Sequence, residues 1–122
     1  MSAEQAERVK TGQEAGSDPE GVRRVMESVS ENIAVEIQRS FDFFKATTAD
    51  QEIHQILLSG GSARVKQLDA FLNQRLKIEV QVNDPLQNLK VNPKKFDMEY
   101  LKENATAAAV AVGLALRKAG DR

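Results

Sequence analysis

Cysteine and tryptophan are both absent from this chain of 122 residues, and histidine occurs once, as His54. Without cysteine the chain forms no disulfide and offers no thiolate to a metal ion. This composition fits a reducing compartment, so we expect a cytoplasmic protein. His54 has no neighbouring ligand or nucleophile in the sequence, and we assign it no catalytic role.

An excess of positive charge is also lacking, because 17 Lys and Arg residues are balanced by 18 Asp and Glu residues. We therefore expect no nucleic-acid partner. The longest apolar segment, residues 105–116, is shorter than the about 20 residues that a transmembrane helix needs. We expect no direct membrane insertion.

Hydrophobic periodicity predicts a long helix in the first half of the chain. A short helix is expected over residues 3–10, and Asp18 followed by Pro19 is typical of a helix start. The helix that begins there should run to about residue 45, with an apolar stripe at spacings of three and four. The stripe comprises Val22, Val25, Met26, Val29, Ile33, Ile37, Phe41 and Phe44. It indicates a face packed within the domain or, alternatively, a coiled-coil surface, and self-association if it is exposed.

The second half of the chain predicts a βαβ unit. Residues 56–58 read as a strand that runs into Ser59-Gly60-Gly61-Ser62, and a helix is expected over residues 62–73. Alternation over residues 78–82 predicts a second strand, parallel to the first. An alanine-rich helix is expected over residues 104–118. Two strands do not cover their own faces and edges, so the chain looks like part of a larger α/β domain.

The paired glycines form the most informative turn in the sequence. Without a Cβ, Gly60 and Gly61 let the backbone approach either a ligand or a closely packed helix. Ser62 is expected to cap the helix that follows and to place its hydroxyl near any ligand. Both interpretations of the glycines remain open from the residues alone.

Four segments in order resemble the C-terminal part of the PilM family, actin-like proteins of type IV pilus assembly that are similar to FtsA, MreB, actin and the heat-shock chaperone ATPases. They are AERVKTG, ILLSGGSARV, KIEVQVNDP and KKFDMEYLKENATAAAVAVGLALRKAGD. The resemblance implies a partial actin-like (ribonuclease H-like) ATPase domain of the α/β class, with a close-packed Ala/Gly terminal helix. Residues 1–50 would be a helical part similar to subdomain IIB, and residues 51–122 a βα part similar to subdomain IIA.

The resemblance also implies a nucleoside site. The adenosine motif of the family matches the turn, so Gly60, Gly61 and Ser62 would lie against adenine or ribose. The AExxK motif matches Glu7 and Lys10, although an exposed ion pair explains these two residues equally well. In the terminal helix, Ala109 and Gly113 match close-packed positions.

What the family needs for chemistry is not found in these residues. ATP and Mg²⁺ are implied for the complete protein, but the DxG phosphate turns are missing, so no tightly bound nucleotide is expected on this chain alone. We predict no catalytic residue and no metal ligand, because Asp42, Asp50 and Asp84 have no useful spacing. Whether ATP is hydrolysed stays open.

Partners and location follow from the same resemblance. It implies binding of the cytoplasmic N-terminal peptide of PilN, through a half of the protein outside these residues, and contact with other type IV pilus platform proteins. The protein would then be peripheral at the inner membrane. The alternative function is a non-catalytic protein-interaction module, in cell division or a pilus or secretion platform, that binds no nucleotide on its own.

Overall fold

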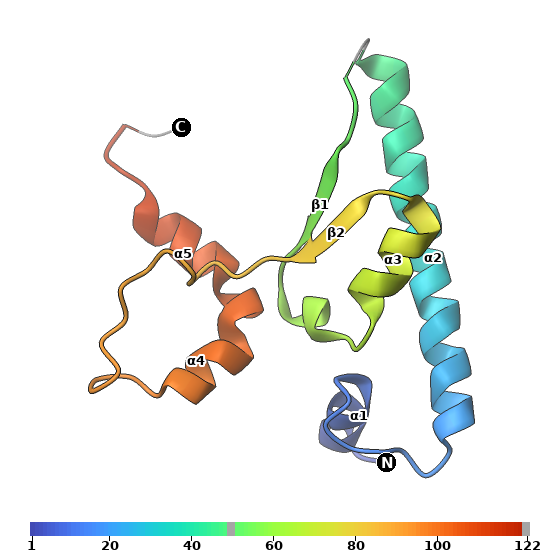
Figure 1. Cartoon of the computed structure of the whole chain (residues 1–122), viewed down its shortest axis with the longest axis horizontal. Coiled ribbons are helices and arrows are strands. Elements are labelled where there is room, and N and C mark those ends of the chain that lie inside the picture. The colour runs from blue at the N-terminus through green and yellow to red at the C-terminus, as the bar shows by residue number, and fades with distance from the viewer. Residues whose placement is uncertain (49–50, 121–122) are drawn as a thin grey trace. The chain divides into compact units, whose positions relative to one another are not determined.

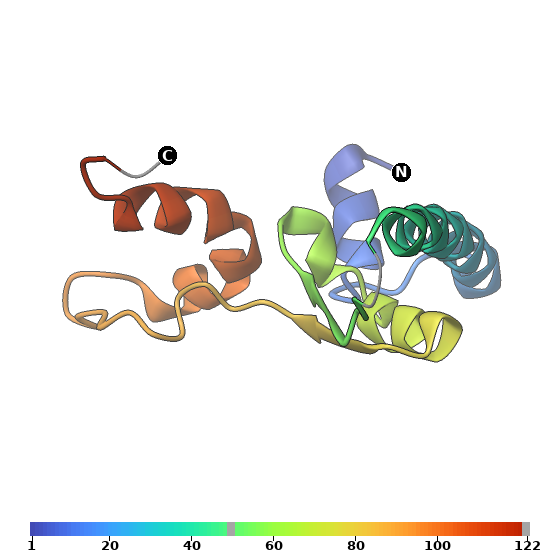
Figure 2. The same cartoon turned by 90° about the horizontal axis from the view of Figure 1, so that it is seen from above.

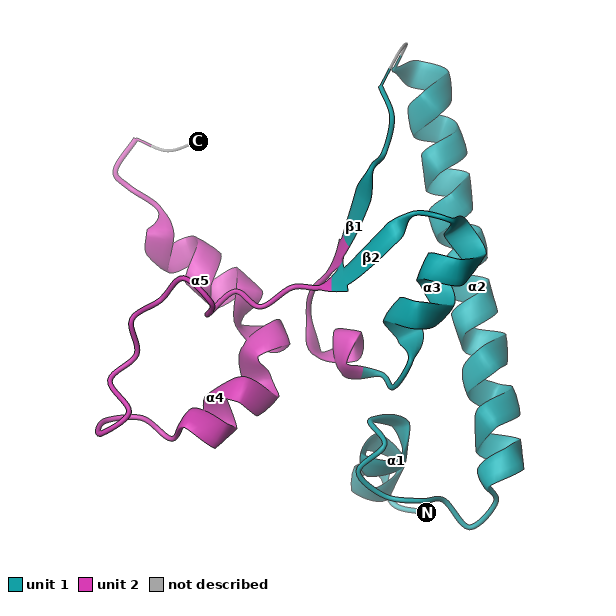
Figure 3. Ribbon diagram, viewed as in Figure 1, with its two compact units in different colours: residues 1–56, 65–81 teal, residues 57–64, 82–122 magenta. Residues whose placement is uncertain are grey.

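The chain forms two compact units, coloured separately in Figure 3. The computed structural model describes residues 1–48 and 51–120. Unit 1 comprises residues 1–56 and 65–81, and unit 2 comprises residues 57–64 and the remainder from residue 82 onward.

Two helices open unit 1, and both begin where the sequence predicts. Helix α1 (Ala3–Lys10) starts with a capping box formed by Ser2 and Gln5. Helix α2 (Pro19–Thr47) starts at Asp18, whose Oδ1 accepts a 2.9 Å hydrogen bond from the amide of Gly21. Each cap satisfies a backbone donor that the first turn leaves unpaired.

The core of unit 1 lies between α2 and α3 (Leu68–Leu76), which run alongside each other in Figures 1 and 2. Leu68, Leu72 and Leu76 are buried at successive intervals of four residues, so they share one face of α3. The buried residues of α2 are the small Ser30 and Ala34. Small side chains let the two helix backbones approach closely, which explains why the leucines are covered.

Strands β1 (Gln55–Leu58) and β2 (Glu79–Val82) pair in parallel on either side of α3 in the sequence. The predicted βαβ unit is therefore confirmed. Val80 is buried whereas its neighbours in β2 are exposed, the pattern of a strand covered on one face.

The apolar stripe of α2 is only partly covered by the described residues. Ile37, Phe41 and Phe44 are half-buried. Val25 and Val29 remain 62% and 51% exposed. The prediction of a packed face therefore holds for one side of the stripe.

The helix expected over residues 62–73 is replaced by two shorter ones. A 3₁₀ helix, η1 (Gly61–Arg64), follows the glycine turn, and α3 begins only at Leu68. Between them Gln67 adopts a left-handed conformation with φ 64°, which breaks the helical hydrogen-bond ladder. Ser62 lies inside η1, so the prediction that it caps the following helix is wrong.

Unit 2 continues with α4 (Met98–Asn104), the 3₁₀ helix η2 (Ala105–Ala108) and α5 (Ala109–Leu116) in direct succession. The helical region thus starts before the predicted residue 104. The close packing falls on its middle, where Ala105 and Thr106 are buried. Gly113 is exposed, and a Cβ built there would meet no described heavy atom within 4 Å, so it is not close-packed within the described residues.

Candidate functional site

The glycine turn follows β1 and has an unusual backbone conformation. It belongs to unit 2, and a second segment of unit 2 holds it in place. Gly60 has φ +92°, a region that side chains with a Cβ rarely adopt. Its amide donates a 2.7 Å hydrogen bond to the carbonyl oxygen of Thr106. Its own carbonyl accepts a 3.2 Å bond from the amide of Ala63, closing the first turn of η1.

Gly61 is the more informative of the two glycines. A Cβ built on either glycine would have no described heavy atom within 4 Å. The backbone conformation explains glycine at position 60, but Gly61 is not in the left-handed region. No packing contact of the described residues requires glycine at position 61, so the surface there is open to an approaching molecule.

Asn83 supports the turn from the end of β2. Its backbone amide donates a 2.8 Å hydrogen bond to the carbonyl oxygen of Leu58. Its side-chain Nδ2 donates a 3.0 Å hydrogen bond to Oγ of Ser59. In the sequence, the run Asn83-Asp84-Pro85 by itself is typical of a turn. The carboxyl ends of parallel strands meet at one edge of a sheet, and this rule places Asn83 beside Ser59.

Thr106 is a second residue that the sequence analysis missed. It is 8% exposed, and its Oγ1 is buried without a hydrogen-bond partner among the described residues. A single hydroxyl in an alanine-rich run carries no pattern from which this position could be predicted.

Glu7 and Lys10 belong to unit 1 and form an ion pair between Oε2 and Nζ, one turn apart on α1. Their side chains are 56% and 34% exposed. The ion-pair interpretation is therefore confirmed, while nucleoside contact stays a prediction. The carbonyl of Lys10 also accepts a 3.2 Å hydrogen bond from the amide of Lys66. This bond fixes the end of α1 to the segment that leads into α3.

A cavity of about 490 Å³ lies in unit 1, within the range of small-molecule sites. Lys10 lines it and Glu7 does not. The wall also contains apolar side chains from α2 and α3, among them Met26 and Phe71, and the polar Ser30. Of the five residues predicted to contact a nucleoside, Lys10 alone lines this cavity.

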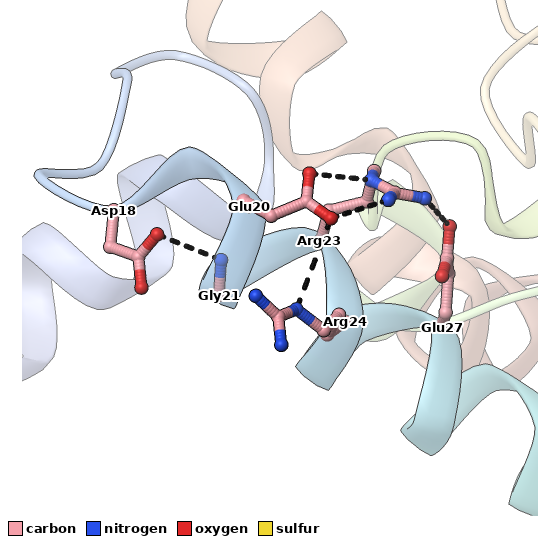
Figure 4. A network of polar contacts seen from close by, with 6 residues as sticks. All are labelled: Asp18, Glu20, Gly21, Arg23, Arg24 and Glu27. Atoms are coloured by element: carbon pink, nitrogen blue, oxygen red, sulfur yellow. Dashed lines mark hydrogen bonds and ion pairs between the residues drawn. The ribbon is translucent and has the colours of Figure 1, made fainter.

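Figure 4 shows the charged network at the start of α2. Arg23 Nη2 lies 2.7 Å from Glu20 Oε1, and Arg23 Nη1 lies 2.7 Å from Glu27 Oε1. Arg24 approaches the same Glu20 oxygen at 3.9 Å. Hydrogen bonding from Arg23, with its positive charge, lowers the pKa of Glu20, and the bond to Glu20 raises the pKa of Arg23. These groups pair with one another on the surface of the helix, where water screens them because each side chain is more than half exposed.

The other acidic residues and the histidine considered in the sequence were assigned no metal or catalytic role. Asp84 Oδ1 accepts a 3.0 Å hydrogen bond from the amide of Leu86, as a turn residue does. Asp42 accepts a 2.9 Å bond from Gln38 Nε2. His54 is exposed just before β1. Asp50 lies outside the described residues. No group of three His, Asp or Glu side chains within residues 1–48 and 51–120 is arranged to hold a metal ion.

A parallel βαβ unit whose first strand ends in an open double-glycine turn, with a long helix before it and an Ala/Gly helix after it, forms a partial α/β domain, consistent with a fragment of the actin-like class. The family model of the type IV pilus assembly protein PilM matches residues 1–119. The chain belongs to this family, and so to the proteins of type IV pilus assembly. None of the described helices is long and apolar enough to cross a membrane.

Proposed function

We propose that this chain supplies the adenosine side of a nucleotide cleft in an actin-like scaffold of the type IV pilus platform. The observation that carries the proposal is the open surface at Gly61, where neither backbone conformation nor a described neighbour requires glycine. A flat ring can lie directly against a backbone that lacks a Cβ. Adenine and ribose offer such a surface.

Each predicted residue then has a distinct role. The backbone at Gly60 and Gly61 contacts the nucleoside, and the exposed Ser62 offers a hydroxyl to it. Within unit 1, Glu7 and Lys10 are proposed as nucleoside contacts on the family resemblance alone, and such a contact by Lys10 would compete with its ion pair to Glu7. Because both side chains of that pair are partly exposed to water, opening it costs little.

Chemistry at the phosphates lies outside this proposal. The proposal concerns the adenosine at the open turn. We derive no hydrolytic step, because the phosphate turns that the family resemblance implies have no match in these residues.

The proposed partners are other platform proteins. The cytoplasmic N-terminal peptide of PilN would bind outside the residues of this chain, and such contacts would hold the protein at the cytoplasmic side of the inner membrane. Peptide binding should then be independent of the glycine turn.

The decisive variant is Gly61→Val in the natural full-length gene product. Gly60→Val is less informative, because a φ of +92° strains any residue with a Cβ and lowers stability by itself. A Cβ built at Gly61 meets no described heavy atom within 4 Å apart from its chain neighbours, so the variant should fold. It should lose ATP affinity by at least about 30-fold in calorimetry, since each factor of ten corresponds to about 1.4 kcal/mol of lost contact.

Ala70→Val is the matched control, because Ala70 is exposed on α3 and valine is equally bulky there. This control should bind ATP like the wild type, and both variants should still bind the PilN peptide. Wild-type ATP affinity in Gly61→Val would show that the turn does not contact the nucleoside.

A second proposal is the non-catalytic interaction module, which the exposed apolar side chains of α5 favour. Val110, Leu114 and Leu116 are 74%, 61% and 65% exposed. Such a module needs no nucleotide. Mass spectrometry of the purified full-length protein separates the two proposals, because copurifying ATP contradicts the nucleotide-free module.

A further inference from the structure

Ser59 and Asn83 are hydrogen-bonded at the point where the two strands end. Ser59 comes directly after β1, and Asn83 comes directly after β2. Asn83 Nδ2 lies 3.0 Å from Ser59 Oγ, and the backbone amide of Asn83 donates a 2.8 Å bond to the carbonyl oxygen of Leu58. Ligands of open parallel sheets bind outside the carboxyl ends of the strands. The pair therefore stands where a ligand of this sheet is expected.

The bond between the two side chains has a direction. The side-chain nitrogen of asparagine carries two N–H donors and no acceptor, so Ser59 Oγ is the acceptor. A serine hydroxyl has a single proton, and when its oxygen accepts from Asn83 that proton points elsewhere. Ser59 is exposed, and its side chain makes no other hydrogen bond within the described part of the chain. Its proton is therefore available to an acceptor that approaches from solvent.

Ser59 also lies next to the open surface at Gly61. The two residues are separated by Gly60 alone, so their Cα atoms are at most about 7 Å apart. The backbone between them is fixed, because the amide of Gly60 donates a 2.7 Å bond to the carbonyl oxygen of Thr106. A nucleoside is longer than this separation. One that lies against Gly61 can therefore meet the Ser59 hydroxyl without any movement of the backbone.

We propose that Ser59 donates a hydrogen bond to an acceptor atom of the adenosine at the glycine turn, and that Asn83 is the positioning residue that directs the serine proton toward it. This inference rests on the proposed function and deepens it. The acceptor is a ring nitrogen of adenine or an oxygen of ribose. Asn83 does not contact the nucleoside, and it acts through Ser59.

The first test is Ser59→Ala in the natural full-length gene product, with calorimetric titration of adenosine and of ATP. Loss of one hydrogen bond should weaken the binding of both ligands about tenfold. The thermal unfolding midpoint without ligand should stay close to that of wild type, because Ser59 is exposed. Unchanged affinity for both ligands would overturn the inference. A loss for ATP without a loss for adenosine would also overturn it, since the acceptor would then be a phosphate oxygen.

The second test reverses the bond between the two side chains. In Asn83→Asp the carboxylate only accepts, so the Ser59 proton turns toward it and the serine oxygen presents lone pairs to the nucleoside. The binding of adenosine, which is uncharged, should weaken by at least about tenfold. Asn88→Asp is the matched control, because Asn88 is an exposed residue of the same unit and receives the same change of charge. This control should bind adenosine like the wild type.

A double-mutant cycle separates positioning from a general effect on the fold. In the Ser59→Ala background no serine proton remains to be directed, so Asn83→Asp should cause no further loss of adenosine affinity. A structural or purely electrostatic role of Asn83 predicts the same loss in both backgrounds. That additive result would overturn the role assigned to Asn83.

The outcome at Gly61 distinguishes failure of this inference from failure of the proposed function. If Ser59→Ala and Asn83→Asp bind adenosine normally while Gly61→Val loses ATP, the inference is wrong and the proposed function stands. If Gly61→Val also binds normally, the nucleoside site itself is wrong. Should Asn83→Asp not fold, Ser59→Thr against Ser59→Ala tests the donor instead, because threonine keeps the hydroxyl. Equal adenosine affinities of these two variants would overturn the inference.

Discussion

Arg75 of α3 forms an ion pair with Glu31 of α2, 44 residues away in the sequence. Arg75 Nε lies 2.9 Å from Oε1 and 3.1 Å from Oε2 of the carboxylate. The contact raises the pKa of Arg75, chiefly through the hydrogen bond to Glu31. Both side chains are about half exposed, at 52% and 43%. Water screens such a pair, so it orients the two helices more than it stabilises them.

The buried leucines should dominate the stability of unit 1. Leu72 is 0% exposed, so Leu72→Ala leaves a cavity and should cost about 2–5 kcal/mol in denaturant unfolding. Leu57→Ala is the matched control, because Leu57 is 57% exposed and loses far less burial. Equal losses for the two variants would place the core elsewhere.

The cap of α2 should be a measurable source of stability. Asp18→Ala removes the acceptor for the Gly21 amide and should cost about 1 kcal/mol, whereas Asp18→Asn retains an acceptor and should cost much less. Thermal unfolding followed by circular dichroism measures both. A similar loss in the two variants would mean that charge, and not the hydrogen bond, is what matters at this position.

Lys77 ends α3 in a left-handed conformation with φ 55°, where glycine is the preferred residue. Lys77→Gly should therefore raise the free energy of unfolding by up to about 1 kcal/mol. Gln74→Gly, in the interior of the same helix, should lower it by about 1 kcal/mol. Chemical denaturation compares the signs, and destabilisation of Lys77→Gly would contradict the assigned conformation.

The network at the start of α2 should respond to acid. Arg23 lowers the pKa of Glu20 in the folded chain. The contribution of this pair to the stability of the folded state is therefore complete above the pKa of Glu20 in the unfolded chain, and it is lost as the pH falls through the pKa of Glu20 in the folded chain. Arg23→Gln should raise the Glu20 pKa toward its ordinary value. Carboxyl-carbon NMR titration of Glu20 measures this shift directly. An unchanged titration would show that the ion pair is not populated in solution.

Local sequence signals predicted the parts of the fold that local chemistry decides. The starts of α1 and α2 follow from side chains that bond to their own neighbourhood, and the βαβ order follows from hydrophobic periodicity. The break at Gln67 did not follow, because glutamine rarely adopts a left-handed conformation and no local signal in the sequence marks it there.

The candidate site shows the same division. The glycine pair and the ion pair of Glu7 with Lys10 could be found from spacing. Asn83 and Thr106 could not be found in that way, because each acts on a segment more than 20 residues away in sequence. Their roles depend on which strand ends and which helices meet.

The way the chain divides between its units has a practical consequence for dissecting the protein. The glycine turn is contributed to unit 2 by residues 57–64 alone, on a loop that leaves unit 1 and returns to it. A single truncation point therefore cannot release either unit intact. Deletion variants should be replaced by grafts in which the 57–64 loop and the segment from residue 82 onward are transplanted together.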